Sequence, residues 1–241
     1  MSPDDFERAT TYPYRIANRS FVYRDGEEHA LDNNDQLPSL DGRTPVLAVG
    51  SNQSPEQLAR KYQGMDWGEI PVIRTSLQDF DSVFSPHIAS YGAIASTLQH
   101  APGVTVTLFV TWLTPSQLER MHETEIASAN YGYGRLDGVR MNCEVGPSLQ
   151  SIHIYNSRRG TLCHNDQPVP VAEVPAEGRR WAAMNQIQVQ DHVRQRLAPK
   201  HDLQTFIGDS ISDASLRHHR SETLKLGARP FDHPDFTEIV I

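Results

Sequence analysis

Four segments in the first half of the chain show the hydrophobic patterns of β-strands. Apolar residues run unbroken from Pro45 to Val49, and apolar or β-branched residues dominate 72–77, 92–98 and 104–113. In 104–113, threonine alternates with apolar residues, which is typical of a strand with one covered face. The connections are too short for helical crossovers, so we expect antiparallel or mixed pairing in a sheet that curls into a small β-barrel. Residues 101–103, Ala-Pro-Gly, predict a turn before the last strand.

Two helices are predicted to begin in the same way. The segments 54–57, Ser-Pro-Glu-Gln, and 114–117, Thr-Pro-Ser-Gln, each offer a capping hydroxyl, a proline at the first helical position and a glutamine at the third. This is the pattern of a capping box with proline at the helix start. We expect the second helix to end at Thr124 or Glu125.

The flanking regions carry weaker patterns. Residues 20–24 followed by Asp25-Gly26 predict one strand of a hairpin, and 31–36 has loop chemistry. Short strands are predicted at 139–145 and 152–155, and an extended run at 168–175. Three helices are predicted after that: one from Trp181 to Leu197, one that starts at about 212 or 213, and another short one that stops at Gly227.

These patterns predict an α+β protein with three regions. Residues 1–44 form an N-terminal extension, 45–155 a domain made of the small mixed or antiparallel barrel and its flanking helices, and 156–241 a C-terminal helical extension packed on that domain. Two alternatives stay open at this point. The first 44 residues could be a partly disordered arm, and residues 156–241 could be a separate helical subdomain.

Composition limits the function. The 241 residues carry a net charge of −8, which argues against a nucleic acid or an anionic membrane as the partner. The acidic start resembles no signal peptide, and no run approaches the roughly 18 apolar residues of a membrane-spanning helix, so we expect a cytoplasmic protein. Cys143 and Cys163, outside any paired motif, are expected to be free thiols.

The first chemical candidate is the corner that follows the strand at 45–49. Val49, Gly50, Ser51 and Asn52 lie between a buried strand and a predicted helix N-terminus, where unpaired backbone N–H groups favour a carboxylate or phosphate. The alternative is an ordinary connection between a strand and a helix.

The second candidate is Glu125. Leu118, Met121, His122 and Glu125 share one face of the predicted second helix, which places an acid on the side that faces the interior. A buried carboxylate must find hydrogen-bond donors or have its pKa raised, and a raised pKa suits proton transfer near neutral pH. The alternative is that Glu125, in the last turn, reaches solvent.

Taken together, these residues resemble the γ-glutamylcyclotransferase-like superfamily over about 45–145. Residues 47–52, Leu-Ala-Val-Gly-Ser-Asn, are similar to the Tyr-Gly-Ser-Asn signature of that family, and Leu118, Met121, Glu125 and Tyr131 follow in its order. The resemblance implies that Glu125 is the general acid/base and that Val49, Gly50, Ser51, Asn52 and Tyr131 bind substrate. This chain departs from the family at Val49, where the family has tyrosine, at His122, where it has aspartate, and at Ile126, where glycine usually follows.

The reaction that the resemblance implies is an intramolecular aminolysis. The α-amine of a γ-glutamyl amine, or of a related small amide, attacks its own γ-carbonyl and releases 5-oxoproline and an amine, without a cofactor. Other motifs are weaker: His122-Glu123 begins like a zinc-binding H-E-x-x-H, but Ile126 replaces the second histidine, and the adjacent His218 and His219 diverge on a helix. The alternative function is a non-catalytic module that binds a small ligand or another protein on the same fold.

Overall fold

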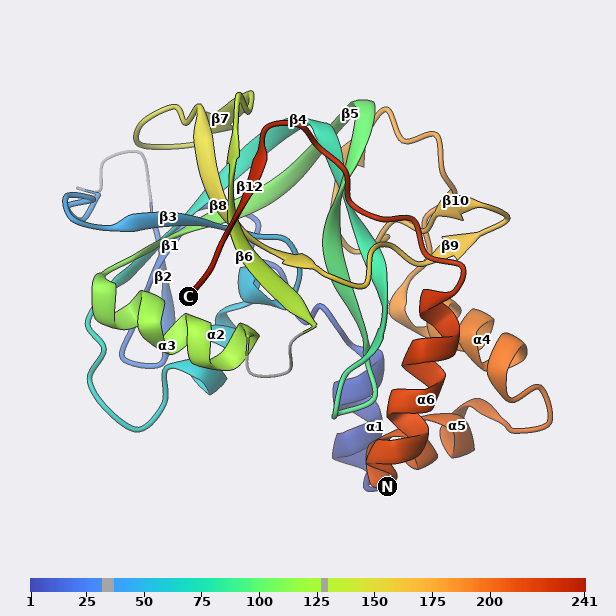
Figure 1. Ribbon diagram of the computed structural model, residues 1–241. Coiled ribbons are helices and arrows are strands. Elements are labelled where there is room, and N and C mark those ends of the chain that lie inside the picture. The colour runs from blue at the N-terminus through green and yellow to red at the C-terminus, as the bar shows by residue number, and fades with distance from the viewer. Residues whose placement is uncertain (32–36, 127–129) are drawn as a thin grey trace.

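Two long antiparallel strands dominate the structure. The computed structural model describes residues 1–31, 37–126 and 130–241, so most of the loop predicted at 31–36 lies outside the described residues. β4 (Ile70–Ile88) and β5 (Ile94–Leu113) pair from Val72↔Thr111 to Ile88↔Ile94, and each includes segments predicted as strands. They form the bent ribbon that crosses the centre of Figure 1.

The predicted turn at 101–103 is wrong, because β5 runs through it. Gly103 has a φ of +84° and Asp79, on β4, has a φ of +66°. The Gly103 N–H donates to Asp79 Oδ1 at 2.8 Å, beside the register shift between Gln78 and Phe80. A proline-glycine pair therefore bends this ribbon at a β-bulge instead of reversing the chain.

The sheet is mixed and open. Its strand order is β12-β6-β8-β3-β5-β4-β1-β2, with β7 paired to β4 and β11 to β5, and β3 and β8 are parallel while the other pairs are antiparallel. The predicted α+β class with mixed pairing is confirmed, but β12 and β2 are free edges, so the barrel is not closed. The remaining strands are β1 (Phe21–Arg24), β2 (Glu27–Ala30), β3 (Thr44–Ala48), β6 (Tyr131–Asp137), β7 (Met141–Cys143), β8 (Ser151–Ser157), β9 (Cys163–His164), β10 (Gln167–Pro168), β11 (Ala176–Glu177) and β12 (Phe236–Ile239).

The predicted hairpin at 20–26 is confirmed by β1 and β2. Arg24 pairs with Glu27 across Asp25 and Gly26, which have φ angles of +54° and +84°. Both central residues thus adopt the left-handed conformation of a two-residue hairpin turn. β1 also pairs with β4, which makes the hairpin one edge of the main sheet.

The helices form two separate groups (Figure 1). α2 (Pro55–Lys61) and α3 (Pro115–Glu125) lie together, away from the second group of α1 (Pro3–Thr10), α4 (Gln186–Leu197), α5 (Leu203–Ser212) and α6 (Ala214–Lys225). No helix among the described residues has the length and apolar character needed to cross a bilayer.

The C-terminal helices differ from the prediction in one start and two elements. α4 begins at Gln186, capped by Asn185, and not at Trp181, because Met184 forms a parallel bridge with Val171. α5 was not predicted, although Asp202 caps it. The predicted start of α6 is confirmed by its Asp213 cap, but the further short helix predicted to stop at Gly227 is wrong, because α6 runs without a break from Ala214 to Lys225.

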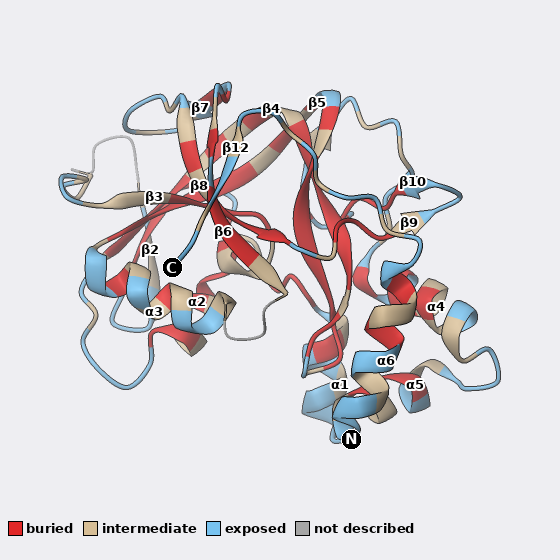
Figure 2. Ribbon diagram, in the orientation of Figure 1, coloured by how far each residue is buried: buried red, intermediate tan, exposed pale blue. Residues whose placement is uncertain are grey.

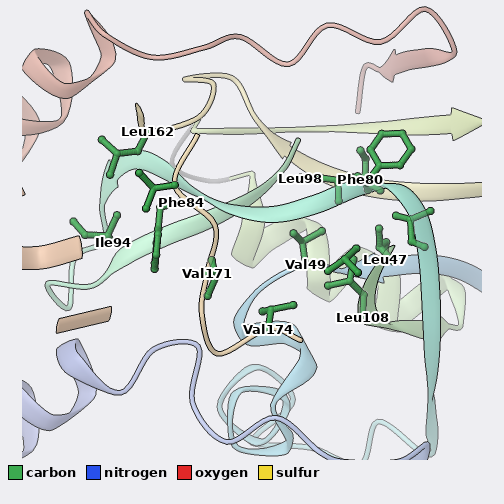
Figure 3. Packing of buried hydrophobic residues seen from close by; sticks show 14 of the residues in the cluster. Leu47, Val49, Phe80, Phe84, Ile94, Leu98, Leu108, Leu162, Val171 and Val174 are labelled. Carbon is green, nitrogen blue, oxygen red and sulfur yellow. The ribbon is translucent and has the colours of Figure 1, made fainter. Parts of the chain in front are cut away.

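The apolar core lies on both faces of β3. Val46 and Ala48 belong to a cluster with Leu58 and Met121 from α2 and α3, whereas Leu47 and Val49 belong to the larger cluster of the opposite face. Figure 3 shows Leu47 and Val49 packed beside Leu108, and Figure 2 shows the buried central strands. Because successive strand residues point to opposite faces, an unbroken apolar run is what a strand covered on both sides requires.

A buried ion pair fastens the chain after β11 to β4. The Arg179 guanidinium donates from Nε and Nη2 to the two oxygens of Asp81, both at 2.8 Å, and the Asp81 side chain is fully buried. Removing one partner of such a pair leaves an uncompensated charge in the interior.

We therefore expect Arg179→Leu to lower the free energy of unfolding by about 3–5 kcal/mol in urea denaturation. The double variant Arg179→Leu with Asp81→Leu should recover most of this loss, because it buries no lone charge. Arg135→Leu, which breaks an exposed pair with Asp137, should cost less than about 1 kcal/mol. Equal losses for the two arginine variants would contradict this account.

Candidate active site

The corner after β3 is built around a short 3-10 helix. η1 (Ser51–Gln53) separates β3 from α2, and Gln53 Nε2 donates to Val49 O at 3.1 Å and Gly50 O at 3.2 Å. Pro55 is the first residue of α2, as predicted, but the Ser54 side chain makes no capping bond, so the capping box with Gln57 is wrong. Instead, the Ser54 N–H donates to Ser51 O at 2.8 Å, which closes the 3-10 turn directly before α2.

α3 follows its prediction closely. The Thr114 and Gln117 capping box is present, the helix ends at Glu125, and Met121 is buried on the inner face. Ile126, where the family usually has glycine, keeps right-handed helical angles, so no glycine is needed there. The two helices are tied together where Arg120 Nε donates to Lys61 O at 2.8 Å.

Glu125 faces the corner and not bulk solvent. Its side chain is 17% exposed, and its Oε1 accepts a hydrogen bond from Asn52 Nδ2 at 3.1 Å and an ion-paired hydrogen bond from Lys61 Nζ. Lys61, the last residue of α2, is itself only 6% exposed. The motif residue Asn52 and the candidate acid are therefore in direct contact.

The electrostatics of this contact keep Glu125 ionised. Burial raises the pKa of Glu125, but the charge of Lys61 and the hydrogen bonds from Lys61 and Asn52 oppose burial and hold the pKa below its usual range. Of the two outcomes open to a buried carboxylate, Glu125 has found donors. Its side chain is therefore a carboxylate at neutral pH.

The structure brings all the sequence-predicted site residues to one cavity of about 510 Å³. Glu125 and Tyr131 line it together with the corner residues Val49, Gly50, Ser51 and Asn52. Tyr131 donates its hydroxyl to Ser96 O at 2.8 Å, and burial raises the pKa of that hydroxyl well above its usual value. A cavity of this size suits a small molecule.

A tyrosine from the N-terminal segment enters the same cavity. The Tyr12 hydroxyl shares a 2.7 Å hydrogen bond with Ser96 Oγ and accepts from Ser96 N at 3.0 Å. A Cβ atom on Gly50 would lie 2.2 Å from this hydroxyl and 2.1 Å from Ser96 Oγ. Gly50 therefore allows a polar pair to approach the corner that any side chain at position 50 would exclude.

Lys61, Tyr12 and Ser96 were not identified from the sequence. A lysine that ends a short amphipathic helix is usually solvated, and only the buried face shared with Leu58 could have drawn attention to Lys61. Tyr12 lies in a polar segment, 84 residues from Ser96, and nothing local indicates that contact.

His122, where the family has aspartate, has a structural partner. Its Nδ1 is 2.7 Å from the hydroxyl of Tyr155, whose ring lines the cavity. The His122 ring also packs edge-on against Tyr133 and Tyr155. This contact orients the Tyr155 side chain.

The described part of the chain contains no group of three or more His, Cys, Asp or Glu side chains that could hold a metal ion.

The charges that line the cavity favour an anion. Arg8, Arg60, Lys61 and Arg217 contribute cationic side chains, and Glu125 is the sole carboxylate among the described lining residues. Two of the arginines lie over aromatic rings, Arg8 at 4.6 Å from the Tyr91 centroid and Arg60 at 4.4 Å from that of Tyr14. In a protein of net charge −8, this is a local reversal of sign.

Comparisons with known proteins give likenesses at low identity. No protein-family model matches the sequence, and no curated protein matches it. A solved structure named gamma-glutamyl cyclotransferase shares 15% identity over 80% of this chain and 91% of its own, with a TM-score of 0.39. An uncharacterized protein from Homo sapiens shares 16% identity over 80% of this chain and 92% of its own, with a TM-score of 0.41.

Lys61→Met tests the electrostatics without reference to any reaction. Burial of Glu125 would remain while its cation is lost, so we expect the pKa of Glu125 to rise, measured by NMR titration of the side-chain carboxyl. In the wild type the folded pKa lies below the unfolded one, so the pair stabilises the fold above the unfolded pKa, and this stabilisation is lost as pH falls through the folded pKa.

The stability difference between wild type and Lys61→Met should therefore be larger at pH about 7 than at pH about 3. Lys200→Met, at an exposed lysine, is the matched control and should leave the pKa of Glu125 unchanged. An unshifted Glu125 in the Lys61 variant would mean that another group holds its pKa low.

Proposed function

We propose that this protein is a γ-glutamylcyclotransferase-like enzyme that converts a γ-glutamyl amine, or a related small amide, into 5-oxoproline and a free amine. The observation that carries the proposal is the hydrogen bond from Asn52 to Glu125, 3.1 Å long, which joins the corner and the acid in one cavity. The cationic lining supports a substrate with a carboxylate.

In the proposed reaction, the α-amine nitrogen forms a bond to the γ-carbonyl carbon, and the bond from that carbon to the leaving nitrogen breaks. The attacking nitrogen becomes acidic as its new bond forms, so a carboxylate can take its proton and pass a proton to the leaving nitrogen. Asn52 and Lys61 both donate to Oε1 of Glu125, so we assign the proton exchange with the substrate to Oε2.

The other lining groups have supporting roles. Backbone N–H groups in the segment 50–52, which lines the cavity, would bind a carboxylate or the oxygen that gains charge during attack. Tyr131, whose hydroxyl hydrogen is donated to Ser96 O, would contact the substrate as part of the cavity wall. Because nucleophile and electrophile belong to one molecule, holding the folded conformation of the glutamyl group supplies much of the acceleration. The Lys61 charge keeps Glu125 ready to accept a proton.

Glu125→Gln tests the proposal directly. We expect 5-oxoproline release to fall by about 10²- to 10⁴-fold, as is typical when a general acid/base is removed. The assay is chromatographic detection of 5-oxoproline from a panel of γ-glutamyl amines and γ-glutamyl amino acids, with circular dichroism as the check on folding. Glu119→Gln, at an exposed position of the same helix, is the control and should retain full activity.

Full activity in Glu125→Gln would remove this residue from the mechanism. Tight binding of a panel member with no 5-oxoproline from any of them, in the wild type, would favour a non-catalytic binding module instead.

Tyr12→Phe tests whether the N-terminal segment serves the reaction. Loss of the hydroxyl leaves Ser96 N and Ser96 Oγ without their partner beside Gly50. A buried unsatisfied group costs about 1–3 kcal/mol, so we expect kcat/KM to fall by about tenfold through misplacement of the corner.

The acid limb of the pH profile of kcat/KM should be unchanged in Tyr12→Phe, because Glu125 keeps its hydrogen bonds from Lys61 and Asn52. Tyr23→Phe, in the core below α2, is the matched control. Unchanged kcat/KM in Tyr12→Phe would show that the hydroxyl is dispensable for the corner.

A further inference from the structure

The attacking nitrogen of the proposed reaction must lose two protons. At neutral pH the α-amine of a γ-glutamyl compound is an ammonium group, which has no free electron pair. One proton must leave before this nitrogen can attack, and a second must leave as its bond to the γ-carbonyl carbon forms. The released amine takes up two protons, so the overall reaction balances. A carboxylate holds one proton at a time, so Glu125 accounts for one of the two transfers.

Glu125 is suited to the second of these protons. The charge of Lys61 opposes the effect of burial and holds the pKa of Glu125 below its usual range, which makes this carboxylate a weak base. A weak base takes a proton readily from a nitrogen that has become acidic during attack, but not from a resting ammonium group. Imidazole has a higher ordinary pKa than a carboxyl group and is the stronger base for the first proton.

An imidazole is connected to the cavity through one hydrogen bond. His122 Nδ1 is 2.7 Å from the hydroxyl of Tyr155, and of these two described residues only Tyr155 lines the cavity. His122 precedes Glu125 by three residues on α3, so the two side chains leave the helix on the same side. The His122 side chain is half-buried. The pair therefore leads from the wall of the cavity toward the surface of α3.

Both members of the pair are in the protonation state that a transfer requires. Burial lowers the pKa of His122, so the ring is neutral at neutral pH and Nδ1 can accept a proton. Burial, together with the charge of Glu125, raises the pKa of Tyr155, so this residue keeps its hydroxyl hydrogen. In the tautomer with hydrogen on Nε2, the hydroxyl donates to Nδ1. Tyr155 can then release its proton only while it takes another.

The neighbours of His122 hold its ring and set its charge. Tyr133 of β6 and Tyr155 of β8 pack edge-on against the ring, with centroids 4.7 Å and 5.7 Å away. Two charged groups act on its pKa in opposite directions: His153 of β8 lowers it and Glu119 of α3 raises it. Burial is the larger effect, so the ring stays neutral in the resting protein.

We propose that Tyr155 is a second catalytic residue, which takes the first proton from the substrate ammonium group, and that His122 acts through it as a positioning residue that holds the proton. The ammonium nitrogen gives a proton to the Tyr155 oxygen while the Tyr155 hydroxyl gives its own to His122 Nδ1, which leaves a free amine and an imidazolium. Both transfers reverse once the leaving nitrogen is free, so the released amine becomes ammonium and His122 is neutral again. This inference rests on the proposed function.

The pH dependence of kcat/KM separates proton transfer from a structural role. We expect Tyr155→Phe and His122→Asn each to lower kcat/KM for a γ-glutamyl amine by about 10²-fold at pH about 7. Asparagine can place an acceptor oxygen where Nδ1 lies but takes up no proton near neutral pH. Without the transfer, only substrate that is already a free amine reacts, so the loss should shrink to about threefold or less at pH about 9.

Tyr23→Phe is the matched control for loss of a hydroxyl. Tyr23 belongs to the same apolar cluster as Tyr155 but does not line the cavity, so this variant should keep the wild-type kcat/KM at both pH values. Thermal melts check that all variants fold. If His122→Asn keeps the wild-type kcat/KM at pH about 7, or if the loss in Tyr155→Phe is the same at both pH values, the pair only shapes the cavity wall and the proposal is wrong.

The wild type and Glu125→Gln separate this inference from the proposed function. If the wild type releases no 5-oxoproline from any γ-glutamyl compound of the panel, both are overturned. If Glu125→Gln is inactive while Tyr155→Phe and His122→Asn retain full activity, the proposed function stands and the second catalytic residue alone is overturned.

Discussion

The site depends on the neutralisation of one buried carboxylate. Glu125 lies at the end of α3 with little exposure to water, and a lone ionised carboxylate there would be costly. Lys61 supplies the opposite charge from the end of α2, and the bond from Arg120 to Lys61 O fixes the distance between the helices. The position of α2 against α3 is therefore coupled to the charge state of the site.

This coupling also decides the charge of the Glu125 side chain. A carboxylate whose pKa is held low is ionised at neutral pH, and in the proposed reaction it would take a proton only from a nitrogen that has become acidic. Such a group works by position more than by basicity. The fixed geometry of Asn52 and Lys61 around Oε1 is consistent with that requirement.

Local sequence pattern was sufficient for the elements that carry the site. The apolar run 45–49, the capping box at Thr114 and the helical spacing from Leu118 to Glu125 are short-range features, and the structure has each of them. Pattern failed at the predicted Ser54 cap, where η1 comes directly before α2, and where a contact between distant segments decides the conformation. Gly103 sits in a bulge because Asp79 binds its N–H, and Met184 is extended because Val171 pairs with it.

The same limit applies to the site residues. The corner and Glu125 lie on elements whose buried faces can be predicted from the local sequence pattern. The contact of Lys61 with Glu125 spans 64 residues and that of Tyr12 with Ser96 spans 84, so no local pattern indicates them. The assignment of residues 1–44 and 156–241 as extensions describes their place in the sequence. Their side chains nevertheless line cavities: Tyr12 lines the one that contains Glu125, and α6 lines an adjacent one of about 400 Å³.

The parallel pairing of β3 with β8 has a consequence for how this protein could diversify. Parallel neighbours end at the same edge of a sheet, so the chain leaves β3 toward the Gly50 corner and leaves β8 toward Arg158 and Arg159. Two adjacent cavities are thus served by two independent loops. Substitutions in the loop after β8 can therefore change the lining of one cavity while the Gly50 corner and Glu125 stay as they are.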